Sequence, residues 1–319
     1  MKIKSGNTFL EISNKPFDGI TDVLWSITEF CNQNCIYCFE SLKNKNILSN
    51  RCVSTSNYFT AVNKLHSLGY KRIHFCGGEA LLANNILDII KYAANYMECV
   101  VITNLSYWNN DLFELFNKEC LKKICISLDS LNENINNYLR GNTRDVILNF
   151  IKLMDYINNN SINIQVEVLC TITQKNINSI RDLLLWCKKI KVNNVSLNPV
   201  ALSEKHPFYD ELALESIYNK SDFNEIKKLF LQKKYLFGTD VKDEMITTLL
   251  EKVLTHEKIK IFDCPTNNTH QYMFIDTEGN SFNCPLKKQF LGNIFDDSIY
   301  YSKQCTEMCD FSLQCLCYW

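Results

Sequence analysis

Three cysteines early in the chain have the spacing of a metal-binding loop. Cys31, Cys35 and Cys38 form a C-x3-C-x2-C motif directly after an apolar, strand-like run. Three thiolates are too few for a closed structural metal site, which takes four protein ligands. In a [4Fe–4S] cluster held by three cysteines, one iron has no protein ligand and stays open to a chelating small molecule. The motif therefore predicts a cluster site with one open iron.

The other cysteines fall into two groups. Of 16 cysteines, three lie in this motif, seven are scattered, and six lie near the C-terminus: Cys264, Cys284, Cys305, Cys309, Cys315 and Cys317. The N-terminal residues lack the pattern of a secretory signal, so we expect a reducing, cytoplasmic compartment where cysteines are thiols or ligands. The scattered cysteines are expected to be small buried hydrophobic residues.

Composition excludes two classes of partner. Lys+Arg 34 nearly balance Asp+Glu 35, the net charge is −1, and no basic block is present. This pattern argues against a nucleic-acid-binding protein. No run reaches the ~18 apolar residues that a membrane helix needs. We therefore expect a soluble protein that contacts neither nucleic acid nor membrane.

An alternation of strands and helices surrounds the cysteine motif. β-Branched apolar runs predict strands at 23–27, 72–76, 100–103, 124–128, 164–171 and 195–198. Amphipathic segments between them predict helices at 56–68, 84–96, 111–120, 144–158 and 177–190. Six such units predict an α/β fold with a parallel sheet. The favoured form is a partial, TIM-like (β/α)6 barrel, and a doubly wound open sheet is the rival.

Two further regions follow the predicted barrel of residues 1–200. Residues 201–261 are expected to form a helical connection, with helices near 212–218, 222–233 and 242–255. Residues 262–319 are cysteine-rich and loop-rich and are expected to form a small separate domain.

Polar residues stand at the ends of the predicted strands. Strand one leads into the cysteine loop, and the later strands end in Gly77-Gly78-Glu79, Thr103-Asn104, Ser127-Leu128-Asp129, Thr171 and Asn198. Ligands of parallel α/β sheets bind at the carboxyl ends of the strands. These residues are therefore predicted to line a single cofactor pocket.

The three-cysteine motif, with Tyr37 before its last cysteine, and Gly77-Gly78-Glu79 at the next strand end resemble the radical S-adenosylmethionine superfamily. The resemblance covers most of the chain. It implies that the open iron of the [4Fe–4S] cluster binds S-adenosylmethionine, whose reductive cleavage yields a 5′-deoxyadenosyl radical that abstracts hydrogen from a substrate. It also implies a reductant such as flavodoxin or ferredoxin. Ala80 stands where the family usually has proline.

The resemblance also implies roles for individual residues. Tyr37 would lie near the adenine, and Gly77 and Gly78 would let the backbone approach the methionyl group. Glu79 would accept a hydrogen bond from the ammonium group. The run that contains Ser127 and Asp129, followed by Arg140, resembles a segment that holds the ribose and the carboxylate. Thr103 and Asn104 would line the same pocket, with a turn role as the alternative for Asn104.

The C-terminal cysteines resemble a SPASM or shortened twitch domain, which houses auxiliary iron–sulfur clusters. Cys264 and Cys284 flank a predicted hairpin turn at Gly279-Asn280. The spacing of Cys305, Cys309, Cys315 and Cys317 departs from the usual SPASM ending. The six cysteines allow one four-thiolate cluster or two clusters that each have an open iron. Zinc is the alternative metal for such cysteine pairs.

The resembling subfamily acts mostly on peptides. We therefore expect maturation of a ribosomal peptide, by thioether or carbon–carbon crosslinking or by epimerisation. Alternatives are a dehydrogenase of a small molecule, a maturase of a sulfatase-type protein, and a non-catalytic iron–sulfur or zinc protein. The residues before Cys31 are too few for a leader-recognition domain, so leader binding is expected to fall to a partner protein or to residues 201–260, or not to occur.

The sequence names no substrate base, and two cysteines are weak candidates for hydrogen-atom donors. Cys76 lies beside the glycine loop, and Cys170 lies on the fifth predicted strand. The alternative for both is a buried strand residue.

Overall fold

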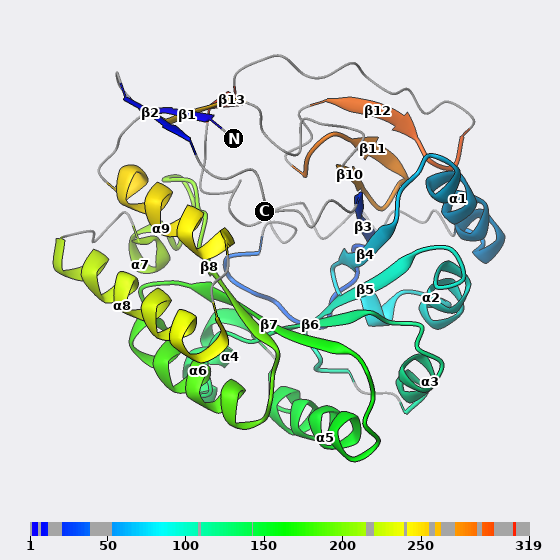
Figure 1. The fold of residues 1–319 in the computed structure, drawn as a ribbon, viewed down its shortest axis with the longest axis horizontal. Coiled ribbons are helices and arrows are strands. Elements are labelled where there is room, and N and C mark those ends of the chain that lie inside the picture. The colour runs from blue at the N-terminus through cyan, green and yellow to red at the C-terminus, as the bar shows by residue number, and fades with distance from the viewer. Residues whose placement is uncertain are drawn as a thin grey trace.

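The computed structural model describes residues 2–5, 8–11, 21–38, 53–107, 110–141, 143–214, 220–238, 241–254, 259–262, 272–285, 289–296 and 309–310. Its centre is a sheet of nine strands in the order β12-β11-β10-β3-β4-β5-β6-β7-β8. Helices surround this sheet on its outer side (Figure 1). None of the helices in the described ranges has the length and apolar character needed to cross a membrane.

Six parallel strands form a partial barrel, as the sequence predicts. They are β3 (Asp22–Thr28), β4 (Arg72–Gly77), β5 (Glu98–Thr103), β6 (Lys123–Ser127), β7 (Gln165–Ile172) and β8 (Asn194–Pro199), each paired in parallel with the next. The curled form, and not the open doubly wound sheet, is confirmed. All six carboxyl ends therefore meet at one end of the barrel.

Alternate residues of each strand face the helices. On β3, Val23, Trp25 and Ile27 are buried in the hydrophobic core. Helix α1 (Thr55–Ser67) buries Ala61, Val62 and Leu65 in the same core. Period-two burial on strands and period-3.6 burial on helices produce this layer.

The outer helices follow the predicted order, with one addition. They are α1, α2 (Ile86–Ala93), α3 (Leu112–Asn117), α4 (Glu133–Arg140), α5 (Val146–Asn159) and α6 (Ile180–Lys189), with short 3-10 helices η1 (Ala80–Leu82) and η2 (Ile177–Ser179). Helix α1 begins after Ser54, whose Oγ accepts from Asn57 N at 3.3 Å.

Helix α4 is absent from the predicted elements. Its eight residues, ENINNYLR, carry three asparagines, which have low intrinsic helix propensity. Asn132 caps it by accepting from Asn134 N and Ile135 N. Packing supplies the remaining stability of this helix, because Leu139 and Arg140 are both buried.

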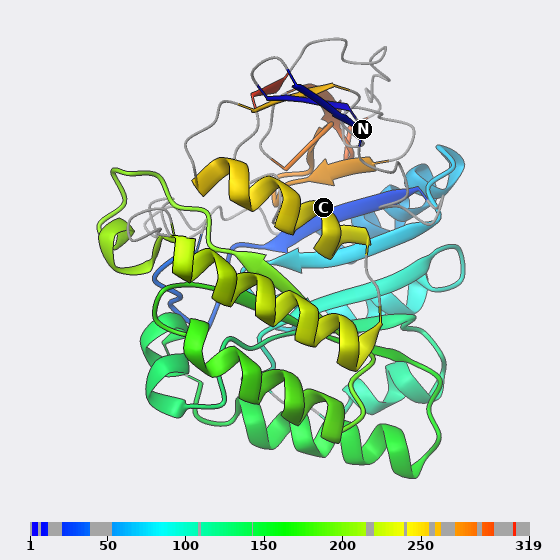
Figure 2. The same ribbon diagram turned by 60° about the vertical axis from the view of Figure 1, so that its left-hand side comes forward.

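Three helices follow the barrel: α7 (Tyr209–Leu212), α8 (Lys220–Phe237) and α9 (Val241–Leu254). Helix α8 lies beside α6 and packs on β8, and α9 lies beside α8 (Figure 2). The helix predicted from residue 212 is wrong at its start, because Ala213 is extended and α7 ends at Leu212. The helices predicted from residues 222 and 242 are confirmed.

The C-terminal strands extend the barrel sheet. Strand β10 (Tyr272–Ile275) pairs in parallel with β3, and β11 (Asn280–Phe282) and β12 (Phe290–Asn293) continue antiparallel beyond it. Gly279, with φ +83°, turns the predicted hairpin between β10 and β11. These strands thus cover the otherwise unpaired edge of β3.

A second sheet joins the two ends of the chain. It has the order β13-β9-β1-β2, formed by β1 (Lys2–Ser5), β2 (Thr8–Glu11), β9 (Ile259–Phe262) and β13 (Cys309–Asp310).

Candidate metal centre

The cysteine loop follows β3 and rests on the C-terminal end of α4. Asn34 N donates to Arg140 O at 3.1 Å, and Ile36 N donates to Leu139 O at 2.9 Å. The last carbonyls of a helix have no partner within the helix, so these loop amides satisfy two of them. The unpredicted helix α4 therefore fixes the shape of the predicted cysteine loop.

The three cysteine side chains form one electrostatic group. Burial raises the pKa of Cys31 and raises that of Cys35 to about 12; the charge of Cys38 adds to both shifts, and that of Cys31 adds to the shift of Cys35. All three residues are partly accessible. Within the described ranges, no three His, Cys, Asp or Glu side chains converge closely enough to hold one metal ion.

The two glycines after β4 lie against the backbone at the end of β3. A Cβ on Gly77 would lie 2.3 Å from Thr28 O, and one on Gly78 would lie 2.3 Å from Phe30 O. Gly78 N donates to Thr28 O at 2.6 Å, and Glu79 N donates to Phe30 O at 2.8 Å. The side-chain positions of both glycines are thus filled by the segment that leads into the cysteine loop, and their approach to the methionyl group stays a prediction.

Glu79 is buried and holds the end of β5. Its Oε1 accepts from Thr103 Oγ1 at 2.7 Å and from Leu81 N at 3.0 Å, and its Oε2 accepts from Asn104 N at 2.6 Å. Burial raises the pKa of this carboxyl, and these hydrogen bonds partly offset the rise. Three of about four acceptor positions of the carboxylate are occupied, which leaves room for one further donor.

Asn104 makes the turn contact that the sequence allows, and it also reaches the cysteine loop. Its Oδ1 accepts from Ser106 N at 2.9 Å, which is a turn contact. Its Nδ2 donates to Cys31 Sγ at 3.7 Å and to Asn32 Oδ1 at 3.0 Å. Ser106 Oγ also contacts Asn32 Oδ1 at 3.0 Å. Sequence reasoning missed Asn32 and Ser106, whose only sequence signal is their nearness to the motif residues.

A buried ion pair lies beneath the cysteine loop. Arg140 Nε lies 2.8 Å from Asp129 Oδ2, and Arg140 Nη2 donates to Asp129 Oδ1 at 3.1 Å. Tyr37 Oη donates to the same carboxylate, and the Arg140 guanidinium lies 5.7 Å from the Tyr37 ring centroid. Burial opposes the charge of Arg140, but the charges of Asp129, Tyr37 and Cys35 outweigh it and raise its pKa.

The remaining strand-end residues lie where the sequence places them. Ser127 and Thr171 are half-buried at the ends of β6 and β7, and Asn198 pairs with Thr171 across the sheet. Asn198 Oδ1 is buried and has no hydrogen-bond partner among the described residues. A buried acceptor without a donor costs about 1–3 kcal/mol, and a donor group of a bound ligand would remove this cost.

The two cysteine candidates for hydrogen donation face different ways. Cys76 is half-buried and shares its strand face with Arg72 and His74. Cys170 is fully buried in the hydrophobic core, on the opposite face from half-buried Thr171. Its Sγ lies 3.8 Å from Asp129 O. This placement suits a structural role for Cys170. Of the two candidates, only Cys76 lies on the inward face of its strand.

Charged residues that sequence reasoning missed line the amino ends of the strands. His74 Nε2 lies 3.1 Å from Asp22 Oδ1, and Arg72 Nη1 lies 3.6 Å from the same oxygen. Lys123 Nζ lies 2.8 Å from Glu167 Oε2. The sequence signal was a charged or ionisable residue at the first or third position of otherwise apolar strands.

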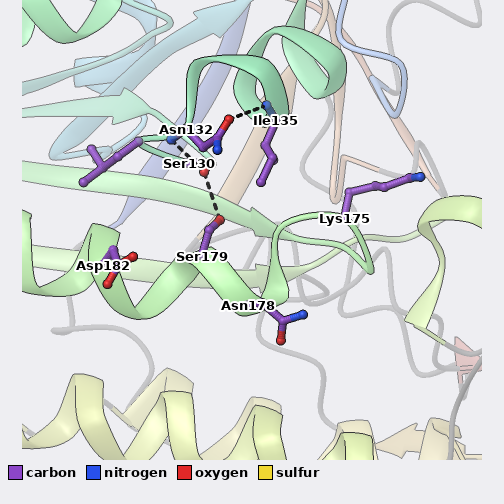
Figure 3. Close-up of a pocket in the computed structure, with 8 residues that line it drawn as sticks. Ser130, Asn132, Ile135, Lys175, Asn178, Ser179 and Asp182 are labelled. Atoms are coloured by element: carbon purple, nitrogen blue, oxygen red, sulfur yellow. Dashed lines mark hydrogen bonds between the residues drawn. The ribbon is translucent and has the colours of Figure 1, made fainter.

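A pocket of about 210 Å³ lies outside the metal centre, between the loops that follow β6 and β7 (Figure 3). Ser130 Oγ and Ser179 Oγ are 2.9 Å apart at its wall, and Lys175 and Asp182 also line it.

Most of the C-terminal cysteines lie outside the described residues, namely Cys264, Cys305, Cys315 and Cys317. Cys284 is buried just after β11, and Cys309 begins β13. The predicted auxiliary clusters stay a prediction.

A family model described as the radical SAM superfamily matches residues 25–187, which include the cysteine loop and five strands of the barrel. The chain belongs to the radical S-adenosylmethionine superfamily. Members of the radical SAM superfamily use a [4Fe–4S] cluster and S-adenosylmethionine, which together supply radical chemistry when bound.

The chain is similar to its curated relatives over only part of their length. An uncharacterized protein of Methanocaldococcus jannaschii is 30% identical over 190 residues, 57% of this chain and 63% of its own length. GTP 3′,8-cyclase of Clostridium perfringens is 30% identical over 110 residues, 34% of each chain. The chain thus covers between one third and two thirds of the length of these relatives.

The fold also matches a solved structure. Streptococcus suis SuiB, determined with S-adenosylmethionine and with the precursor peptide SuiA, has TM-scores of 0.64 and 0.62 and identities of 15% and 16%. The matches cover 87% and 88% of this chain and 64% and 63% of SuiB. At this sequence identity, the similarity to SuiB shows a shared fold and nothing more.

The residues at the carboxyl end of the barrel fit both cofactors of the superfamily. Three thiols suit a cluster that needs one further ligand, and Asn104 donates to one of them. The partnerless oxygen of Asn198 suits a ligand that carries donor groups. These residues would bind and orient the two cofactors.

Proposed function

We propose that this radical SAM protein matures a peptide, by a reaction that begins with hydrogen abstraction from a residue of that peptide. One observation carries the proposal: the thiols of Cys31, Cys35 and Cys38 lie in one loop held at the carboxyl ends of the barrel strands. Cys31, Cys35 and Cys38 would hold the cluster.

The neighbouring strand ends would bind S-adenosylmethionine. Glu79 has one acceptor position left for the ammonium group. Asn198 offers its buried oxygen, half-buried Thr171 pairs with it on the neighbouring strand, and Ser127 stands half-buried at the end of β6. Tyr37 would lie near the adenine.

The peptide substrate is supported by the shared fold. SuiB, which is similar over 88% of this chain, was determined with a precursor peptide bound. A leader segment of the peptide would bind a separate protein or the helices α8 and α9. The reductant would be a flavodoxin or a ferredoxin.

One or two auxiliary iron–sulfur clusters would accompany this activity. The hairpin of β10 and β11 holds Cys284 buried at its end. Cys264, Cys305, Cys309, Cys315 and Cys317 would supply the remaining ligands. An auxiliary cluster at this site would accept the electron that the substrate radical returns.

The first experiment tests for radical chemistry. The full chain is reconstituted anaerobically with iron and sulfide and incubated with dithionite and S-adenosylmethionine, and 5′-deoxyadenosine is measured by mass spectrometry. We expect its formation by the wild-type chain and its loss in Cys35→Ala. A matched control is Cys187→Ala, because Cys187 is buried in the core far along the chain from the motif. A fully loaded wild-type protein that forms no 5′-deoxyadenosine would refute the proposal.

A nucleotide substrate is the second candidate. It is favoured by the 30% identity to GTP 3′,8-cyclase of Clostridium perfringens. Incubation of the loaded protein with GTP, in parallel with short peptides encoded beside its gene, separates the two. A new nucleotide product with unchanged peptides would replace the peptide proposal.

A further inference from the structure

The carboxylate of Asp129 is enclosed by protein groups. It is fully buried, its Oδ1 accepts hydrogen bonds from Arg140 Nη2 at 3.1 Å and from Thr171 N at 2.8 Å, and its Oδ2 accepts one from Tyr37 Oη. Arg140 Nε lies 2.8 Å from the same Oδ2. Three hydrogen bonds and the adjacent guanidinium thus surround the buried carboxylate. The sequence resemblance implies that Asp129 belongs to the cofactor pocket; in the structure its carboxylate binds Arg140, Tyr37 and Thr171.

The guanidinium held by Asp129 reaches a candidate cluster ligand. Arg140 Nη1 donates to Cys35 Sγ at 3.9 Å. The Arg140 backbone oxygen accepts from Asn34 N, one residue before Cys35. One residue thus contacts the cysteine loop through both its backbone and its side chain, and Asp129 fixes the orientation of that side chain.

The described chain holds other ion pairs in its interior. Lys233 and Asp243 are both buried and lie 2.5 Å apart, and half-buried Lys123 lies 2.8 Å from Glu167. The pair of Asp129 and Arg140 is notable because its cation also lies against Cys35.

We propose that Asp129 is a positioning residue that holds Arg140 against Cys35 and Tyr37 and sets the charge balance beside the cluster, without touching S-adenosylmethionine. The proposal rests on the cluster site proposed above. A neutral residue at 129 leaves the Arg140 charge uncompensated beside Cys35. One-electron reduction adds a negative charge to the cluster, so an uncompensated cation favours the reduced form.

The experiment measures the midpoint potential of the cluster by EPR during titration with dithionite, without S-adenosylmethionine. The signal that changes when S-adenosylmethionine is later added identifies the cluster of Cys31, Cys35 and Cys38. We expect a more positive potential for Asp129→Asn, with iron content equal to wild type. Arg140→Lys should shift the potential the other way, because a lysine ammonium can stay on Asp129 but cannot also reach Cys35.

Glu167→Gln is the matched control. It removes a buried, paired carboxylate from the same barrel, at the amino ends of the strands. We expect the wild-type potential for this variant, so that a change in Asp129→Asn reflects the position of the charge and not general loosening of the barrel.

Three results would overturn the proposal. One is an unchanged potential in loaded Asp129→Asn. The second is an equal shift in Glu167→Gln. The third is loss of S-adenosylmethionine binding by Asp129→Asn at unchanged potential, which would make Asp129 a cofactor ligand. If Asp129→Asn does not fold, Arg140→Lys decides, and a potential equal to wild type or higher overturns the proposal. A wild-type protein that binds no cluster would instead refute the proposed function.

Discussion

Gly78→Ala should detach the cysteine loop from the barrel. The new Cβ would lie 2.3 Å from Phe30 O, 2.6 Å from Phe30 C and 2.7 Å from Glu29 O, whereas ordinary contacts begin at 3.4 Å. These are backbone atoms, so the segment from β3 to Cys31 must move by about 1 Å, as ordinary van der Waals packing requires.

The cost can be estimated from the contacts that would be lost. Overpacking of this kind costs about 1–3 kcal/mol. The hydrogen bonds from Gly78 N to Thr28 O and from Glu79 N to Phe30 O would weaken, at about 0.5–1.5 kcal/mol each. The free energy of unfolding should therefore fall by about 2–6 kcal/mol, a large part of the stability of a domain.

Urea unfolding of the apo-protein and iron content after reconstitution measure both effects. We expect Gly78→Ala to lose stability and most of the iron bound by Cys31, Cys35 and Cys38. Gly69→Ala is the control, because Gly69 has φ +90° but no atom within 4 Å of its Cβ position. It should cost about 1 kcal/mol of backbone strain and leave the iron content unchanged. Gly78→Ala with wild-type stability and iron would refute the close approach described here.

Three further outcomes are expected. Replacing Cys31, Cys35 and Cys38 together by Ala should leave the iron of the auxiliary clusters, and residual iron near zero with bound zinc would instead assign the C-terminal cysteines to zinc. Burial raises the pKa of Cys35 to about 12 from the ordinary 9.0. Above about pH 9 the thiol therefore loses its proton more readily in the unfolded state, so the stability of the apo-protein should fall as the pH rises. A urea midpoint that is flat up to about pH 10.5 would contradict this. Lys233→Ala should destabilise the protein by about 3–5 kcal/mol, because it removes the cation that is paired with buried Asp243. Thermal unfolding of Lys233→Ala, with Lys234→Ala as the control, measures this loss.

The sequence predicts most of the barrel because its signals are local. Period-two apolar runs located all six parallel strands, with ends within two residues of those observed. The hairpin at Gly279 was likewise visible as a turn signal. Helix α4 was not, because three asparagines and a short apolar stripe give weak local preference. Its stability comes from contacts with the cysteine loop, which no window of sequence contains.

By itself the sequence determined the cysteine spacing, the glycine loop and the order of strands, and these suffice to place the chemistry at the carboxyl ends of the barrel. Only the tertiary structure decided which groups meet there. It joined Asp129 to Arg140 and Tyr37, placed Arg140 on Cys35, and packed Gly78 against Phe30. Spacing along a chain fixes which face of an element a residue occupies. Contacts between residues on different elements depend instead on how those elements pack.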